Sequence, residues 1–418
     1  MYGRSVRALG GVVLALLASV PARAQDVDKE TAEQAHDMSQ MDMASSAWRF
    51  MQDGSFSAVF NHQGGPRGGN QVTGVNWWMG MVSRPVKSGQ LTLTGMFSLE
   101  PATVGTRGYR ELFQSGEAID GRPNIDHQHP HDAFMQVSAV WAKALSESTA
   151  VSVAAAPAGE PALGPIAFMH RASAAAIVFA PLGHHTFDAT HVSFGVLTGG
   201  IARGRWGFEG SVFNGREPDQ HRWDVELAAP DSLSGRVWFH PSDEWAVQVS
   251  TGHLVQPEAL EPGNVIRTTA SASWTRARPD SLSAITMAYG RNDGAGQQAA
   301  FGEFTSQRGA YTLSSRVEFV EIENELLLDD LSSASTADHA KHLDTVGALT
   351  LGAIRRVGRW GGLETGVGMN ASVYAVPGAL RPTYGAHPFS FQLFIQVRPH
   401  FGSMGPMWNM RMGQTMSY

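Results

Sequence analysis

The sequence of 418 residues contains no cysteine. This absence excludes disulfide bonds, thiolate metal sites and lipid attachment at an N-terminal cysteine, and it suits transit through an oxidising compartment. After Val20 the chain also lacks any run of 18 or more apolar residues, so no membrane-spanning helix is expected. Charged residues make up only 17% of the chain, whereas a soluble protein more often carries about 25%. The net charge of −7 argues against nucleic acid as a partner.

The N-terminus has the features of a secretory signal peptide. Arg4 and Arg7 precede a short apolar run from Leu9 to Val20, and Ala22-Arg23-Ala24 places small residues where a signal peptidase cleaves. We therefore expect residues 1–24 to be removed and the protein to be exported. The alternative is a buried helix at an unprocessed N-terminus.

The dominant periodicity of the remaining chain is two residues, which indicates strands with one apolar and one polar face. Leu91, Leu93 and Phe97 alternate with Thr92, Thr94 and Ser98. The same alternation recurs in several further segments: Val75–Met81, Trp245–Ser250, Leu313–Phe319 and Phe389–Arg398. Soluble β-sandwiches show this alternation too, so periodicity alone does not settle the architecture.

The connections between the strands favour a barrel. We predict sixteen strands, at residues 55–62, 72–83, 90–100, 133–143, 149–156, 191–202, 205–214, 231–239, 244–254, 265–276, 282–291, 299–306, 311–322, 344–356, 361–374 and 389–401. The even-numbered gaps between them are short, whereas the odd-numbered gaps include long ones near 101–132, 157–190, 215–230, 323–343 and 375–388. Strict alternation of this kind is typical of an up-and-down transmembrane β-barrel with tight turns at one end and long loops at the other. The predicted fold class is therefore all-β, with a single antiparallel barrel at residues 55–401. The prediction is sixteen strands, within a range of 12 to 18.

The last predicted strand resembles the final strand of Gram-negative outer-membrane barrel proteins, which alternates apolar and polar residues and ends in an aromatic residue. Phe389 to Phe401 fits that pattern, although the chain continues to Tyr418. The resemblance implies a porin-like protein in the outer membrane, with membrane lipids and the barrel assembly machinery as partners.

The first long loop ends in a stretch that is rich in histidine. Its three imidazoles could bind a divalent transition metal, because imidazole suits copper, zinc and nickel. Alternatively, the loop folds into the lumen and bonds to wall residues such as Arg267 and Arg316. The predicted metal ligands here are His127, His129 and His131, and Asp126 and Asp132 are predicted lumen residues.

The second long loop also carries ionisable side chains. Its Gly- and Pro-containing turns suggest an ordered structure, and Ala172 to Ala180 is apolar enough for a short buried helix. We expect it either to constrict the pore or to form an outer cap without a selectivity role. The predicted constriction residues are His170, His184, His185 and Asp188.

Methionines are concentrated at both ends of the chain. A leader at 25–54 and a tail at 402–418 are both expected in the periplasm if the strand count is even. Thioether ligands select Cu(I) and Ag(I), and the leader resembles in composition those of copper-resistance outer-membrane proteins. The alternative is a Met-rich surface that docks a periplasmic partner. The predicted ligands are His36, Met38, Met41, Met43, Met404, Met407, Met410 and Met412.

These observations predict a diffusion channel or transport-related barrel for small polar solutes or metal ions, and the Met-rich ends suggest a role in soft-metal homeostasis or resistance. No cofactor is required. One alternative is a barrel that is plugged completely by its loops and serves a structural or binding role. Another is a barrel hydrolase that uses His131 with Asp132 or His185 with Asp188 as a general base, but no G-x-S-x-G motif is present, and we expect no enzyme activity.

Overall fold

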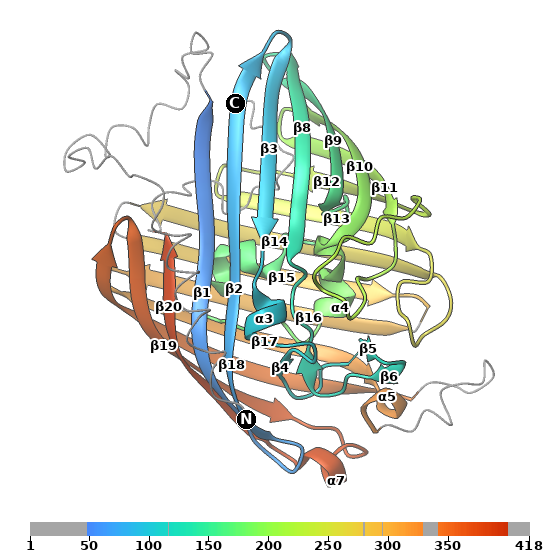
Figure 1. The fold of residues 1–418 in the computed structure, drawn as a ribbon, viewed down its shortest axis with the longest axis vertical. Coiled ribbons are helices and arrows are strands. Elements are labelled where there is room, and N and C mark those ends of the chain that lie inside the picture. The colour runs from blue at the N-terminus through green and yellow to red at the C-terminus, as the bar shows by residue number, and fades with distance from the viewer. Residues whose placement is uncertain (1–47, 116, 279–280, 295, 329–341, 400–418) are drawn as a thin grey trace, which may run out of the picture.

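Sixteen strands form one closed antiparallel barrel, in which each pairs with the barrel strands that precede and follow it in the chain (Figure 1). The computed structural model describes residues 48–399 apart from 116, 279–280, 295 and 329–341. The barrel closes where β1 pairs with β20, with Phe56 opposite Val397 and His62 opposite Phe391. The predictions of an all-β up-and-down barrel and of sixteen strands are both confirmed.

The observed strands lie close to the predicted ranges. They are β1 (Arg49–Gln63), β2 (Gly69–Val86), β3 (Gly89–Phe97), β8 (Phe134–Ser146), β9 (Thr149–Gly159), β10 (Ser193–Arg203), β11 (Trp206–Asn214), β12 (Ser232–Phe239), β13 (Trp245–Leu254), β14 (Val265–Arg278), β15 (Ser281–Asn292), β16 (Gln297–Arg308), β17 (Tyr311–Glu323), β18 (Leu343–Trp360), β19 (Leu363–Ala375) and β20 (Phe389–Pro399). β1 begins at Arg49, so the barrel extends into the range predicted for the leader. Within the described residues, no helix is long and apolar enough to cross a membrane.

The two faces of the strands differ in chemistry. On the outer face, Leu93 and Leu393 are 38% and 48% exposed, whereas Thr94 and Gln392 on the inner face are each 4% exposed. Most strands therefore present apolar side chains outward and polar side chains inward, as the period of two predicts. β2 departs from this pattern along much of its length, because Val75, Trp77, Met79 and Met81 are all buried on its inner face.

The inward apolar face of β2 packs against chain segments inside the barrel. Trp77 and Met79 form a buried cluster with Met135 on β8 and with Val192 and Phe194 at the start of β10. The alternation alone could not assign this face, because an apolar side chain can be covered by lipid or by a loop in the lumen.

The long connections gather at one end of the barrel, and the tight turns lie at the other end (Figure 1). The first long loop, residues 98–133, contains α3 (Glu100–Thr103) and the short strands β4 (Tyr109–Arg110), β5 (Ala118–Ile119), β6 (Arg122–Pro123) and β7 (His127–Gln128). The second, residues 160–192, contains η2 (Phe168–His170), η3 (Ala172–Ala174), α4 (His184–Phe187) and η4 (Ala189–His191), and we call it the inner loop. Two further short helices, α5 (Asn324–Leu328) and α7 (Arg381–Tyr384), lie in later long connections.

Candidate functional site: the lumen and its histidine cluster

The inner loop follows the inside of the barrel wall, where wall side chains satisfy its backbone. The hydroxyl oxygens of Ser211 on β11 and Ser250 on β13 accept hydrogen bonds from the backbone N–H groups of Ala162 (2.7 Å) and Gly164 (2.9 Å). Further along, the Asn370 side chain on β19 donates to the Ala176 carbonyl at 2.6 Å. A buried backbone needs such partners, so the polar wall holds this loop in place. Of the two alternatives for this loop, these contacts with the inner wall do not support the outer cap.

The predicted helix at Ala172–Ala180 is wrong, because only the single 3-10 turn η3 forms there. The Ser173 carbonyl accepts a hydrogen bond from the Thr305 hydroxyl at 2.7 Å, and the Phe179 and Ala180 carbonyls each accept one from Arg316 at 3.1 Å. Since wall side chains donate hydrogen bonds to these carbonyls, the segment does not need the internal hydrogen bonds of a helix.

Arg171 connects the inner loop to strand β16 of the barrel wall. Its guanidinium makes two hydrogen bonds of 2.9 Å to the carboxylate of Glu303 on β16 and a third, of 3.0 Å, to Asp188. Arg316 on β17 also donates to Glu303, at 2.9 Å. All four side chains are at most 2% exposed. Burial of four charges requires such pairing, because an unpaired charge in this environment is strongly unfavourable.

The loops cover the inner wall almost completely in this conformation. Thr269 on β14 and Thr305 on β16 both have an exposed fraction of 0%. A cavity of about 10 Å³ lies beside Arg316 and Glu318, and one of about 30 Å³ lies beside Gln307 and Arg356. Volumes of this size hold about one or two water molecules.

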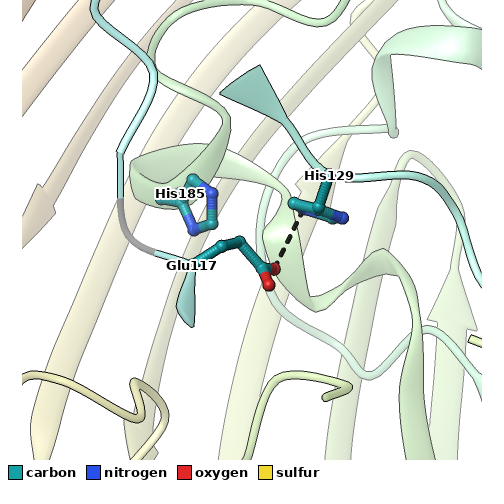
Figure 2. Close-up of side chains that lie close together, drawn as sticks. All are labelled: Glu117, His129 and His185. Atoms are coloured by element: carbon teal, nitrogen blue, oxygen red, sulfur yellow. Dashed lines mark ion pairs between the residues drawn. The ribbon is translucent and has the colours of Figure 1, made fainter. Parts of the chain in front are cut away.

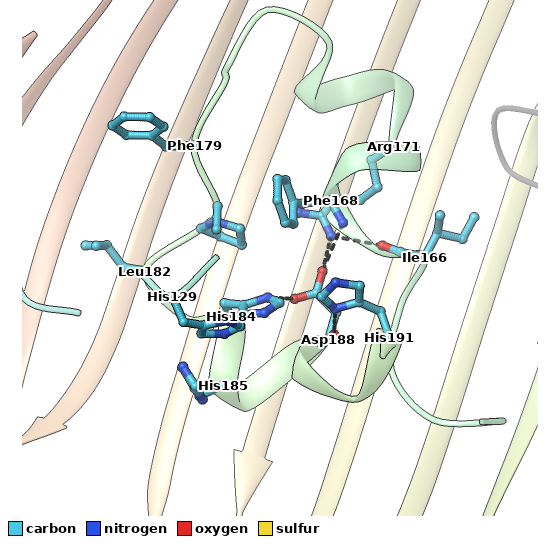
Figure 3. A network of polar contacts seen from close by, with 12 residues as sticks. His129, Ile166, Phe168, Arg171, Phe179, Leu182, His184, His185, Asp188 and His191 are labelled. Carbon is cyan, nitrogen blue, oxygen red and sulfur yellow. Dashed lines mark hydrogen bonds and ion pairs between the residues drawn. The ribbon is translucent and has the colours of Figure 1, made fainter. Parts of the chain in front are cut away.

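Histidines from both loops gather beside the Arg171 network, and Figure 3 shows four of them, His129, His184, His185 and His191. The rings of His129, His184, His185, His191 and His131 form a continuous cluster, with centroid separations between 5.1 and 5.8 Å. Burial lowers the pKa of His129 and His191 well below the ordinary value, and nearby positive charge lowers it further. These two imidazoles are therefore neutral at neutral pH.

Asp188 fixes one end of this cluster. It accepts a hydrogen bond from His184 Nδ1 at 2.7 Å, and its backbone carbonyl lies 2.7 Å from Nδ1 of His191. Despite burial, the neighbouring His184 and Arg171 hold the pKa of Asp188 far below its ordinary value. His185 does not contact Asp188 and instead lies 3.2 Å from Glu217. The predicted pairing of His185 with Asp188 as a general base is therefore wrong.

The three histidines predicted as one metal site face three different partners. His127 Nδ1 lies 2.9 Å from the Ile125 carbonyl, His131 Nδ1 lies 2.9 Å from Glu100, and His129 Nε2 lies 3.3 Å from Glu117. His127 and His129 flank Gln128, and Pro130 then separates His129 from His131, so their side chains diverge. Among the described residues, the groups whose ligand atoms lie within 4.8 Å of one another do not include these three histidines together.

The two acidic residues of this stretch are paired with arginines that the sequence did not indicate. Asp126 pairs with Arg67 at 2.6 Å, and Asp132 pairs with Arg222 at 3.0 Å. Burial raises the pKa of Asp132 to about 6, although Arg222 opposes this shift. The predicted wall partners are not used: Arg316 holds the inner loop, and Arg267 donates to Asn292 on β15 at 2.9 Å.

A second grouping brings together residues from four loops around His185. One triad consists of Glu117, His129 and His185 (Figure 2), and another of His185, Glu217 and Glu258. In each triad the candidate ligand atoms all lie within 4.8 Å of one another. Sequence analysis missed Glu117, Glu217 and Glu258, because isolated glutamates in separate loops carry no spacing signal.

His170 lies apart from these triads, with its ring centroid 4.9 Å from that of Trp77. The predicted ligands at the two ends of the chain, namely His36, Met38, Met41, Met43, Met404, Met407, Met410 and Met412, lie outside the described residues, as does the predicted signal peptide.

No family model matches the chain, and no curated protein sequence matches it. The fold does have relatives among solved structures. OprB of Pseudomonas putida aligns with a TM-score of 0.52 over 85% of this chain and 94% of its own, at 9% identity. This is a porin-like barrel fold. An anion-selective porin from Comamonas acidovorans also aligns, with a TM-score of 0.48 and 8% identity over 84% of this chain and all of its own. At 9% identity the likeness to OprB shows a shared fold and does not assign a substrate.

Proposed function

We propose that this porin-like barrel lies in a bacterial outer membrane and acts there as a narrow channel for small polar solutes, restricted by the inner loop. The barrel has an apolar outer face, represented by Leu393 and Ile395, which are 48% and 54% exposed. Side chains of this kind suit contact with lipid. A closed barrel also leaves no unpaired strand edge, which a structure in lipid requires.

The observation that carries the channel proposal is the polar character of the inner wall. Ser250, Thr269, Thr305 and Ser314 all point inward, where a barrel serving only as a scaffold could be filled with aliphatic side chains. The side-chain oxygens Oε1 of Gln248 and Oγ of Ser234 are buried without a partner among the described residues. Such atoms are normally satisfied by water, which supports a hydrated lumen.

The near-complete cover of the wall supports a second candidate, a barrel that the inner loop plugs. In a narrow channel, solutes pass beside the inner loop. In a plugged barrel, solutes can pass only if the inner loop moves out of the lumen. Purified protein in planar bilayers tests this, with a variant in which residues 165–187 are replaced by a short Gly-Ser linker. A narrow channel gives small conductance steps in the wild type and steps several-fold larger in the variant. If the wild type does not conduct and the variant does, the result supports the plug. If neither protein conducts, the result contradicts the channel proposal.

The hydrolase alternative receives less support from the geometry. His131 contacts Glu100 rather than Asp132, and the one buried His–Asp pair in this region, His184–Asp188, is 1% exposed on both sides. A general base must reach the proton that it removes, so this pair is poorly placed for an external substrate. Assays of lipid and peptide hydrolysis with detergent-extracted protein test the alternative directly.

A role in copper or silver homeostasis remains a proposal based on composition. Its ligands would be the thioethers of the leader and tail, which suit soft monovalent ions. The tail from Met404 to Met416 would be periplasmic in an even-stranded barrel, where it could bind such an ion or dock a periplasmic partner.

A further inference from the structure

We propose that Glu117, His129 and His185 form a binding site for one divalent transition-metal ion of the zinc type at the outer end of the lumen (Figure 2). The site differs from the histidine set that the sequence suggested, and it does not depend on whether the barrel conducts. It combines two residues of the first long loop with one residue of α4.

The ligand types and their spacing suit such an ion. Zinc binds imidazole nitrogen and carboxylate oxygen at about 2.0–2.2 Å, which places tetrahedral ligands about 3.3 Å from one another. The Nε2 atom of His129 already lies 3.3 Å from Oε1 of Glu117, and all three ligand atoms lie within 4.8 Å. Side-chain movements of about 1 Å would therefore complete the coordination.

The ligand atoms are available to an ion. Oε1 of Glu117 and Nε2 of His129 are both buried without a hydrogen-bond partner among the described residues. The second oxygen of Glu117 accepts a hydrogen bond from Arg222 at 2.8 Å, which orients the carboxylate and leaves Oε1 directed at His129. The side chains of the triad retain 10–14% exposure, so the three residues lie close to the surface of the loops.

The surroundings of His185 support its part as a ligand. Its Nδ1 lies 3.2 Å from Glu217 and 3.6 Å from Glu258, on the side of the second triad. Carboxylates beside a metal-binding histidine fix the orientation of its ring and raise its basicity. Imidazole and carboxylate together favour borderline divalent ions over Mg²⁺, and the triad contains no thioether to favour Cu(I).

The test uses the full chain in detergent micelles, stripped of metal by a chelator and dialysed against Zn²⁺ in the presence of excess Mg²⁺. Bound zinc is counted by elemental mass spectrometry. We expect E117Q, H129Q and H185Q each to lose one equivalent of tightly bound Zn²⁺ relative to the wild type, with affinity lowered about tenfold or more. H240Q, in the turn between β12 and β13, is the matched control and should retain all of the zinc. Circular dichroism checks that each variant is folded, and E117Q conserves the hydrogen bond from Arg222.

The variants E217Q and E258Q separate the two triads. If the first triad holds the ion, they should weaken binding less than H129Q does. Abolition of binding by E258Q with unchanged binding by H129Q would overturn the assignment of Glu117 and His129. Equal zinc content of the wild type and all three triad variants would overturn the site altogether. Because zinc content is measured without a bilayer, either result is separate from the success or failure of the channel proposal.

Discussion

Arg171 on the inner loop and Glu303 on β16 form a two-point ion pair inside the barrel. Nε of Arg171 lies 2.9 Å from Oε2 of Glu303, and Nη2 lies 2.9 Å from Oε1. Because Glu303 also accepts a hydrogen bond from Arg316, one carboxylate links the inner loop to two neighbouring strands. This arrangement makes Glu303 the residue on which attachment of the inner loop most depends.

Replacement of Glu303 by Gln should therefore loosen the inner loop. It leaves Arg171 and Arg316 buried with reduced compensation, and loss of one partner from a buried pair costs about 3–5 kcal/mol of unfolding free energy. Urea titration of the protein in lipid vesicles measures this change. E244Q, which removes the exposed pair with Arg276, is the control and should have little effect. A similar midpoint for E303Q and E244Q would contradict the anchoring role.

Arginine at Leu393 tests the outer face of the barrel. L393R should destabilise the protein by about 2–4 kcal/mol if this position lies near the middle of a bilayer. Gln307, which borders the cavity of about 30 Å³ on the inner side, is the comparison, and Q307R should cost less. Thr94 and Gln392 also face inward, but each is only 4% exposed, so Gln307 is the better position for an inward-facing arginine. Equal loss of stability in L393R and Q307R would mean that the two faces are misassigned.

Topology can be tested with single cysteines, because the native chain has none. Ser146 and Ser242 lie in exposed tight turns, and Asp219 lies in a long connection at the opposite end, with its side chain 53% exposed. In intact cells an impermeant thiol reagent should label D219C, whereas S146C and S242C should react only after the outer membrane is permeabilised. Labelling of S146C in intact cells would reverse the proposed orientation.

Acid should weaken the protein partly through His170. Burial lowers its pKa from 6.5 to about 4, with a smaller contribution from the charge of His131. Between pH 6.5 and pH 4 the unfolded state therefore binds a proton that the folded state does not, so the unfolding free energy falls as the pH falls through this window. The contribution is about 1–3 kcal/mol. Urea midpoints at pH 7 and pH 4.5 should differ less in H170Q than in the wild type, and equal differences would contradict the assignment.

The Met-rich tail can be examined as a synthetic peptide of residues 402–418. If its thioethers bind Cu(I), binding should persist at pH 5 as at pH 7, because thioether sulfur is not protonated in this range. A peptide with every Met replaced by Leu is the control. Equally weak binding of Cu(I) by both peptides would leave partner docking as the explanation for the tail.

The sequence by itself determined the barrel. Alternation of apolar and polar side chains is a property of neighbouring residues, and the parity of short and long connections is visible in the order of the chain. Sixteen strands and the faces of Leu93 and Leu393 could therefore be predicted. The inner and outer faces of β2 could not be assigned from the sequence, since only the packing of Trp77 inside the barrel shows what covers its apolar face.

Only the tertiary structure decided what the loops do. The inner loop lies in the lumen because hydroxyl, amide and charged groups on distant strands satisfy its backbone and Arg171, and no local pattern reports such partners. Glu117, His129 and His185 likewise come together only through contacts between residues that are distant in the sequence. Sequence analysis found the histidines but grouped His129 with its neighbours in the chain, whereas the fold groups it with residues from other loops, because inward folding of the loops brings these side chains together.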